Sequence, residues 1–171
     1  MLSQTKILVI GCPGSGKSTF ARKLRDKTGL PLYYLDMLFH RPDRSTADRE
    51  TFDSSVRGIL SRESWIIDGN YQRTLPMRFE QAELIFLFDL PVEECLEGAL
   101  SRVGSVREDM PWVETEFDPD FRQYIIDFPR DQLPAIRELI MAHRGEKEVV
   151  VFKSRLEADA YLNSLGRESS D

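Results

Sequence analysis

The most specific chemical signal lies near the start of the chain, in segment 11–18, which reads GCPGSGKS. This segment satisfies the pattern GxxxxGK[ST], whose glycines let a loop curl so that backbone N–H groups converge on phosphate oxygens. An apolar run precedes it and a helical pattern follows it, which is the context that the motif requires. The N-terminus of that helix adds roughly half a positive charge. The segment therefore predicts a site for nucleotide phosphates.

The side chains at the end of this segment have separate predicted roles. Lys17 is placed to reach the β- and γ-phosphates, and Ser18 offers a hydroxyl to Mg²⁺. The rest of the predicted phosphate-binding loop consists of Gly11, Pro13, Gly14, Ser15 and Gly16.

Two aspartates compete for a second metal-binding role. Asp68 follows the apolar run 65–67, and Asp89 follows the run 84–88. Asp68 begins a loop with a glycine, polar side chains and an arginine, whereas Asp89 precedes a helix that it could simply cap. We favour Asp68 as the Mg²⁺ ligand, either directly or through water.

A third carboxylate, Asp36, ends the apolar run 32–35. Ligands of α/β sheets bind at the carboxyl ends of the strands, so Asp36 could hold or deprotonate an acceptor hydroxyl there. A structural role in capping the turn is the alternative reading.

Arginines could supply the positive charge that phosphoryl transfer needs around the transferred group. Arg73 lies in the Asp68 loop, Arg102 ends a predicted helix, and Arg107 lies in a long polar loop. Arg130 follows that loop. Nearby acidic residues could instead pair with some of these side chains.

Short apolar runs alternate with helical patterns along the chain. The runs 6–10, 32–35, 84–88 and 148–152 predict buried parallel strands, and 65–67 is a weaker fifth candidate. Helical periodicity follows at 20–24, 52–60, 92–103, 121–128 and 133–140, with a break at Pro129, and the final helix opens with a capping box at 154–157. The pattern predicts a right-handed α/β fold.

Length and charge exclude several classes of protein. The 171 residues fit one domain, and the net charge of −6 counts against a protein that coats nucleic acid. Two cysteines cannot build a disulfide framework, so we expect a cytoplasmic protein. We expect neither a signal peptide nor a membrane span. The polar segment 104–120 is long for a connecting loop and suggests a lid.

At the level of whole segments, the sequence resembles the adenylate-kinase-like P-loop kinases, and within them the bacterial topology modulation proteins. The matching segments are GCPGSGKSTFARKL, TGLPLYYLDMLF, WIIDGNYQRTLPMRFEQAELIFLFDLP, REDMP and FDPDFRQYIIDFP. The resemblance implies a five-stranded parallel sheet sandwiched by helices, a mobile lid at 104–130 and ATP·Mg²⁺ as ligand. It also implies an acceptor-binding insertion at 38–63, whose few basic residues count against AMP as acceptor.

The resemblance also implies roles for individual residues. Thr19 joins the phosphate-binding loop, and Asp68 with Gly69 opens the loop on the acceptor side. Arg102 falls on the arginine that packs against the adenine base, and Arg130 is a candidate for the arginine returning from the lid. Arg73 lies one place beyond the corresponding arginine of adenylate kinases.

Two functions follow from these observations. The first is an enzyme that transfers the γ-phosphoryl group of ATP to a small acceptor, such as a nucleoside, a nucleotide or another metabolite. The second is a nucleotide-dependent regulator of DNA topology or of its protein partners. A DNA-binding face would need clustered basic residues, and the candidates Arg22, Lys23, Arg25 and Lys27 are spread around one helix.

Overall fold

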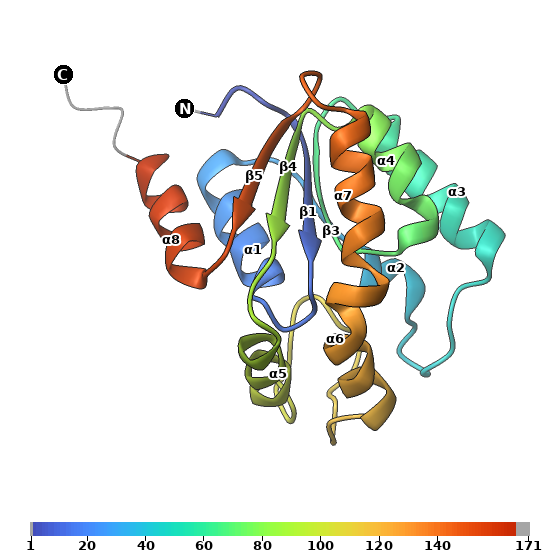
Figure 1. Ribbon diagram of the computed structural model, residues 1–171. Coiled ribbons are helices and arrows are strands. Elements are labelled where there is room, and N and C mark those ends of the chain that lie inside the picture. Colours follow the sequence, from blue (N-terminus) through green and yellow to red (C-terminus); the bar gives the residue numbers. More distant parts are fainter. Residues whose placement is uncertain (1, 167–171) are drawn as a thin grey trace.

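Five parallel strands form one sheet in the order β2-β3-β1-β4-β5 (Figure 1). Their bounds are β1 Lys6–Gly11, β2 Leu32–Tyr34, β3 Trp65–Asp68, β4 Leu84–Phe88 and β5 Glu148–Phe152. The computed structural model describes residues 2–166. All five apolar runs of the sequence form strands, including the weaker candidate at 65–67. The register pairs Val9 with Asp68 and Gly11 with Phe88, which brings the carboxyl ends of three strands to one edge.

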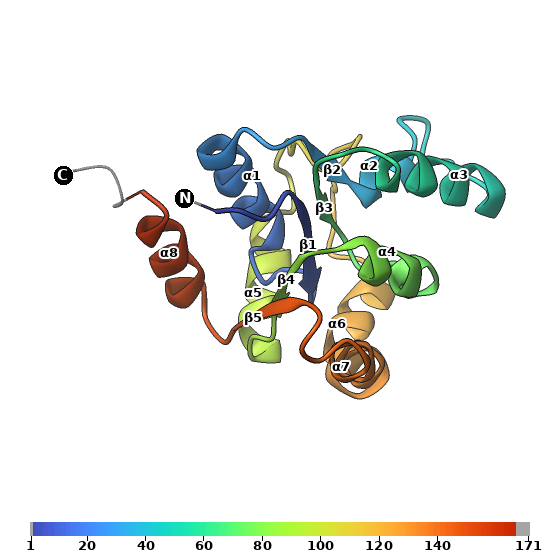
Figure 2. The same cartoon turned by 90° about the horizontal axis from the view of Figure 1, so that it is seen from above.

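Helices cover both faces of the sheet. They are α1 Lys17–Thr28, α2 Leu35–Phe39, α3 Arg49–Leu60, α4 Leu75–Gln81, α5 Val92–Ser101, α6 Pro119–Asp131, α7 Leu133–Ala142 and α8 Arg155–Ser164, with a 3₁₀ turn at Gln72–Thr74. Seen from above, α1 and α8 lie on one side and α3, α4 and α7 on the other (Figure 2). Helices α5 and α6 lie below the carboxyl ends of the strands (Figure 1). This arrangement confirms the predicted adenylate-kinase-like α/β fold.

The core explains why the strands are continuously apolar. Strand β4 is buried along its whole length because helices cover it on both faces. On the α1 side, Phe20 packs edge-on against Phe86, Phe88 and Phe152, with ring centroids 4.8 to 5.3 Å apart. These contacts fix α1, and with it the loop that precedes α1, against the sheet.

Local signals set the ends of several helices. Asp48 caps α3 by accepting a hydrogen bond from the Thr51 N–H, and Ser154 caps α8 by accepting one from the Glu157 N–H. Gly29 ends α1 in the left-handed conformation, with φ of 73°. The predicted capping box thus marks the start of α8.

The structure differs from the sequence-based expectation at two boundaries. Strand β2 stops at Tyr34, and Asp36 lies in the first turn of α2, where a carboxylate is favoured by the helix dipole. Pro129 does not end the helix as predicted, and α6 continues through it to Asp131. Because Pro129 has no backbone N–H, the Ile125 carbonyl does not receive its usual helical hydrogen bond. The Cys12 thiol donates to this carbonyl instead, at 4.0 Å.

Two irregular segments lie at the carboxyl edge of the sheet. The hairpin loop (residues 40–46) is closed by an antiparallel bridge between His40 and Thr46. The lid loop (residues 102–118) contains no helix or strand and leads into α6. Within residues 2–166, no helix combines the length and the apolar character needed to cross a membrane.

Candidate active site

The phosphate loop (residues 11–18) joins β1 to α1 below the sheet (Figure 1). Its tight path depends on glycine, because Gly11 and Gly14 have φ angles of 134° and 80°. A Cβ atom on Gly11 would lie 2.2 Å from the Phe88 carbonyl oxygen, and one on Gly14 would lie 2.0 Å from that of Cys95. The loop is therefore pressed against β4 and α5, and it ends at the N-terminus of α1.

Two functional side chains leave this loop. The Lys17 ammonium donates to the Cys12 carbonyl at 3.3 Å, and the Ser18 hydroxyl donates to Asp68 Oδ2 at 2.5 Å. Pairing of β1 with β3 brings Asp68 to this position. The structure thus places Lys17, Ser18 and Asp68 together, and these are residues that the sequence analysis proposed for a metal-assisted phosphate site.

The surroundings of Asp68 suit a cation. Its side chain is buried, and Oδ1 has no hydrogen-bond partner among residues 2–166. Burial raises the pKa of Asp68 to about 6, although the Lys17 charge and the Ser18 hydroxyl oppose the shift. The free carboxylate oxygen of Asp68 and the adjacent Ser18 hydroxyl are oxygen ligands of the kind that Mg²⁺ prefers.

Asp89 lies in a different environment. Its carboxylate pairs with Arg137 at 3.1 Å and with Lys153, and it lines neither of the two large cavities described below. Of the two aspartates considered from the sequence, Asp68 is the one that contacts the phosphate loop.

The loop after β3 connects the phosphate loop with Asp36. The Asn70 side-chain amide accepts from the Gly11 N–H at 3.0 Å and donates to the Gly11 carbonyl at 2.7 Å. The next residue, Tyr71, has a φ of 40°, and its hydroxyl donates to Asp36 Oδ1 at 2.7 Å. Burial and the Asp36 charge raise the pKa of Tyr71, so the phenol remains a donor.

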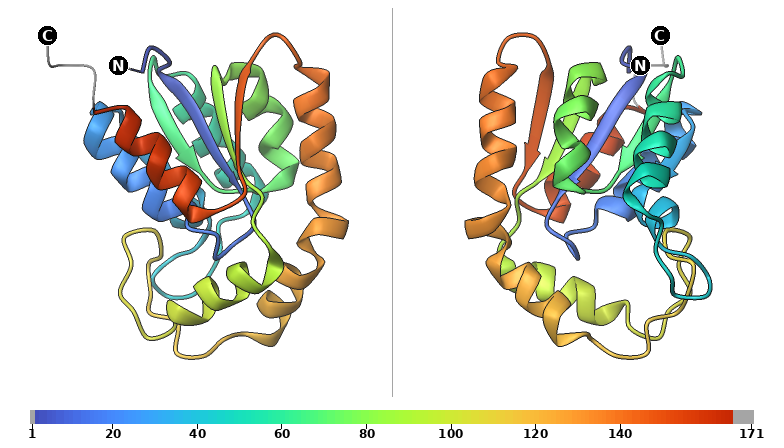
Figure 3. Two further views of the ribbon diagram at one scale, coloured as in Figure 1. Left: turned by 60° about the vertical axis from the view of Figure 1, so that its left-hand side comes forward. Right: turned by 90° about the vertical axis from the view of Figure 1, so that its right-hand side faces the viewer.

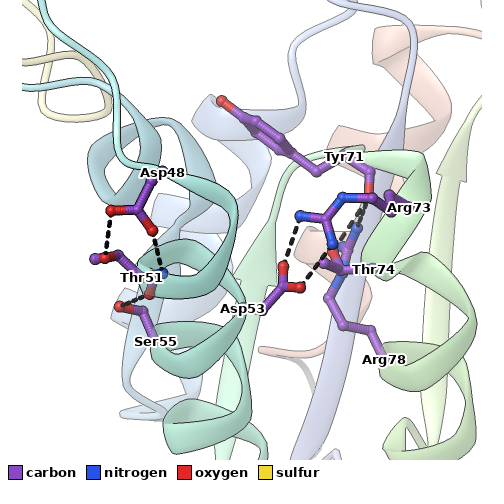
Figure 4. Close-up of polar contacts among 8 residues, drawn as sticks. All are labelled: Asp48, Thr51, Asp53, Ser55, Tyr71, Arg73, Thr74 and Arg78. Carbon is purple, nitrogen blue, oxygen red and sulfur yellow. Dashed lines mark hydrogen bonds and ion pairs between the residues drawn. The ribbon is translucent and has the colours of Figure 1, made fainter.

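Arg78 holds this loop from beneath, a role that the sequence did not suggest. Its guanidinium is fully buried and donates to the carbonyls of Gly69 and Asn70. It also donates to the Tyr71 carbonyl at 3.2 Å (Figure 4). Burial lowers the pKa of Arg78 to about 9, which leaves the group charged at neutral pH. Within residues 2–166 its acceptors are three backbone carbonyls and the Thr74 hydroxyl, so no carboxylate partner marks this residue in the sequence.

Arg73 and Arg130 lie away from these groups. Arg73 points toward α3 and forms a bidentate pair with Asp53, with both contacts at 2.6 Å (Figure 4). Arg130 is exposed and pairs with Asp131 at 2.7 Å and with Asp127 at 3.3 Å. Neither residue lines the two cavities.

Two cavities meet at the phosphate loop. The first, of about 630 Å³, is lined by Asp36, Pro13, Asp68 and the loop 69–72, and the hairpin and lid loops enclose it. The second, of about 500 Å³, is lined by Gly14, Gly16 and Thr19. Both include Lys17, Ser18, Arg102, Arg107 and Asp109. We call these five residues the junction.

The junction contains charges that the sequence suggested only in part. Arg102, a candidate from the sequence, lines both cavities, and burial lowers its pKa. Arg107 lies 3.8 Å from Asp109 and 3.9 Å from Glu114. Arg155, which the sequence gave no reason to select, lines the second cavity and donates to the Gly14 carbonyl at 2.9 Å.

The lid loop packs on the hairpin loop, and Figure 3 shows the two side by side. Trp112 of the lid meets the edge of the His40 ring, with centroids 4.9 Å apart. The Arg44 guanidinium lies 5.8 Å from the centroid of the Trp112 ring. All three residues also line the first cavity, so these contacts help to enclose it.

Comparison with known proteins identifies the fold. No protein-family model matches the chain, and no curated protein matches it. Its structure is similar to that of a shikimate kinase from Acinetobacter baumannii in complex with shikimate, with a TM-score of 0.61, 18% identity, and coverage of 98% of this chain and 97% of that one.

Two further solved structures are similar over most of both chains. A shikimate kinase from Bacteroides thetaiotaomicron has a TM-score of 0.59 and 14% identity, covering 95% of this chain and 97% of that one. A gluconokinase from Sinorhizobium meliloti 1021 has a TM-score of 0.56 and 19% identity, covering 94% and 93%. The chain therefore has the fold of P-loop kinases.

Proposed function

We propose that the protein is an ATP-dependent phosphotransferase that moves the γ-phosphoryl group of ATP to a hydroxyl of a small acceptor. The observation that carries this proposal is the junction, where two cavities share Lys17, Ser18, Arg102 and Arg107. A phosphoryl transferase needs a donor and an acceptor that approach one phosphorus atom from two sides. Two cavities that meet at cationic side chains satisfy this requirement.

The second cavity is the proposed ATP site. Its wall is the phosphate loop, whose backbone N–H groups and helix dipole attract phosphates. Lys17 would bind the β- and γ-phosphates, and Arg102 would pack against the adenine base, as the resemblance in sequence implies. Arg107, which lies in both cavities, would bind equatorial oxygens of the transferred group.

Ser18 and Asp68 would hold Mg²⁺. The unpartnered Oδ1 of Asp68 and the neighbouring Ser18 hydroxyl supply oxygen ligands, and Mg²⁺ commonly keeps several waters besides one or two carboxylates and substrate phosphates. When bound, the ion neutralises charge on the β- and γ-phosphate oxygens.

Asp36 is the proposed general base. It lines the first cavity, and the Tyr71 hydroxyl bonds one of its oxygens, so the second oxygen is free to accept the proton of the acceptor hydroxyl. As the acceptor oxygen forms its bond to phosphorus, the bond to the bridging oxygen of ATP breaks and ADP leaves. The closed lid would limit the access of water, which otherwise competes as the nucleophile.

Arg73 and Arg130 would contact the transferred phosphate only after a rearrangement. Each forms ion pairs with carboxylates, Arg73 with Asp53 and Arg130 with Asp127 and Asp131, so each would have to exchange these partners to reach a phosphate. The finer assignment to the topology modulation proteins rests on the segments that resemble that family, and the assignment to the cytoplasm rests on the two cysteines, too few for a disulfide framework.

Lys17→Ala tests the proposed site. We expect phosphoryl transfer to fall about a hundredfold to a thousandfold, since one preorganised cation at the transferred group is lost, while the fold is retained. ATP-dependent phosphorylation of a metabolite panel, followed by mass spectrometry, measures the effect. Lys23→Ala is the matched control, because Lys23 is exposed on the same helix and pairs with Asp159. Unchanged transfer in Lys17→Ala would contradict the site.

A further inference from the structure

The first cavity, which we call the acceptor cavity, carries acidic and aromatic side chains on its walls beyond the junction. The acceptor's reacting hydroxyl must lie at the junction, so the rest of the molecule faces the remaining walls. The described lining residues outside the junction, apart from Asp68, include four carboxylates and one guanidinium, that of Arg44. Glu114 lies 3.9 Å from Arg107 of the junction, which leaves the carboxylates of Asp36, Glu116 and Asp118 on these walls. Charge on these walls therefore disfavours an acceptor with a carboxylate or phosphate group.

The other arginines near the cavity do not offset this charge. Arg73 is held by Asp53, and the buried Arg78 donates to three backbone carbonyls. Arg44 lies at the exposed rim, against the face of Trp112. Recognition of an anion usually relies on charge-assisted hydrogen bonds from arginine or lysine, and these walls offer no paired guanidinium groups for it.

Flat apolar surfaces make up much of the remaining wall. Aromatic rings come from Tyr71 on the loop after β3, Trp112 and Phe117 on the lid loop, and Phe121 and Tyr124 on α6. Aromatic faces stack on planar rings and pack on apolar bodies. Asp36 is then the polar group that orients the reacting hydroxyl, through the oxygen that Tyr71 leaves free.

We propose that the acceptor is an uncharged alcohol that carries a planar ring, and that Trp112 and the neighbouring aromatic rings select it over hydroxy acids and phosphate esters. This inference rests on the proposed function, because it describes the acceptor of the same reaction. Nucleosides are the probes that match the class, since they combine free hydroxyls with a planar base and have no charge.

Binding can be measured without turnover. The chain has two tryptophans, and Trp65 is fully buried, so a ligand in the acceptor cavity should quench Trp112. With a non-hydrolysable ATP analogue and Mg²⁺ present, four ribonucleosides are titrated against their 5′-monophosphates and against shikimate. We expect at least one nucleoside to bind at least tenfold more tightly than its monophosphate and than shikimate. Equal or tighter binding of the anions, or no quenching by any nucleoside, overturns the inference.

Variants of the lid loop test the role of the ring. Because the Trp112→Phe and Trp112→Ala proteins lose the fluorescence signal, their binding is followed by calorimetry. Trp112→Ala should weaken nucleoside binding at least tenfold and leave binding of the ATP analogue intact, which also shows that the protein is folded. Trp112→Phe should retain most of the affinity. Val113→Ala is the control, because Val113 neighbours Trp112 but does not line the cavity. Nucleoside binding that survives in Trp112→Ala would overturn the proposed role.

Failure of this inference differs from failure of the proposed function. If nucleosides bind in the acceptor cavity but receive no phosphoryl group, the kinase proposal fails and the ligand class stands. If hydroxy acids or monophosphates are phosphorylated in preference to nucleosides, the kinase proposal stands and the ligand class is wrong.

Discussion

Asp36 and Asp68 are two carboxylates at one sheet edge with different surroundings, and the difference suits different work. Asp36 lies in the acceptor cavity with one oxygen bonded by Tyr71, whereas Asp68 is buried beside Ser18 with an oxygen that has no partner. The first environment suits a group that exchanges a proton, and the second suits a group that binds a cation. The proposed mechanism follows from this division.

Arg78 makes a prediction at the scale of single residues. Replacing it in Arg78→Met leaves buried carbonyls of the loop after β3 without donors, so we expect a loss of about 3 kcal/mol or more in the free energy of unfolding. Urea denaturation measures this loss. The control Arg73→Met removes an exposed ion pair and should leave the free energy of unfolding nearly unchanged. Equal stability of the two variants would contradict the buried role of Arg78.

The sequence predicted some of these residues and missed others for a physical reason. Lys17 and Ser18 belong to a contiguous motif, and Asp68 follows an apolar run, so local patterns were enough to find them. In the part of the chain that the structure describes, Arg78 bonds to backbone carbonyls and the Thr74 hydroxyl, and Arg73 pairs with a carboxylate twenty residues earlier in the chain. Partners of these kinds have no pattern in the sequence and appear only after folding.

Among the elements, α5 and the phosphate loop pack so closely that only glycine fits on both sides. A Cβ atom on Gly98 of α5 would lie 2.0 Å from the Gly14 carbonyl oxygen, and one on Gly14 would meet α5 at Cys95. The phosphate loop therefore takes its shape partly from α5. Helical periodicity predicted α5 and continuous apolar runs predicted the strands, but the run through Tyr34 and Leu35 concealed the boundary between β2 and α2.

Replacing glycine by alanine within a helix usually stabilises a protein, but we expect Gly98→Ala to destabilise this one. The new methyl group would displace the phosphate loop, so we expect a cost of about 2 kcal/mol and weaker binding of an ATP analogue. Calorimetry and thermal unfolding measure the two effects. Gly58→Ala is the matched control in α3, where nothing lies within 4 Å of the new Cβ, and it should stabilise by about 0.5–1 kcal/mol. A stabilised Gly98→Ala protein with normal nucleotide affinity would refute this packing argument.

The contact between the lid and hairpin loops should weaken in mild acid. Burial lowers the pKa of His40, and the carboxylates of Asp36 and Glu114 oppose the shift. The packed state therefore binds the proton less well than the open one. The contribution of neutral His40 to the stability of the packed state is present above pH about 6.5 and is lost as the pH falls through the lowered pKa of His40.

The emission of Trp112 reports this change. We expect a shift to longer wavelength between pH about 7.5 and about 5, as the ring becomes exposed. His40→Asn should remove the pH dependence, and His143→Gln, which changes the other histidine of the chain, should retain it. The same transition in His40→Asn would assign it to a different group.

On the scale of the whole molecule, an acidic body surrounds a few cations near the phosphate loop. The net charge is −6, yet Lys17, Arg102, Arg107 and Arg155 all line the proposed ATP cavity. Three of the four basic residues of α1 that were candidates for a DNA-binding face have carboxylate neighbours. These pairs are Arg22 with Asp109, Lys23 with Asp159 and Arg25 with Glu108.

Nucleotide binding should stabilise the whole protein. At a hundredfold excess over its dissociation constant, an ATP analogue with Mg²⁺ adds about 2.7 kcal/mol. For a chain of this size we therefore expect Tm to rise by about 5–10 °C. Differential scanning calorimetry measures the shift, which Lys17→Ala should largely abolish. A wild-type Tm that does not respond to the nucleotide would rule out the proposed donor site.

One small contact links the two halves of the site. The two hydrogen bonds between the Asn70 amide and the backbone of Gly11 join the phosphate loop to the loop that bears Tyr71, and Tyr71 in turn holds Asp36. A ligand that orders one loop should therefore lower the entropy cost of ordering the other, so we expect the proposed nucleotide and acceptor to bind with positive cooperativity. By thermodynamic linkage, the factor by which the nucleotide tightens acceptor binding equals the factor by which the acceptor tightens nucleotide binding.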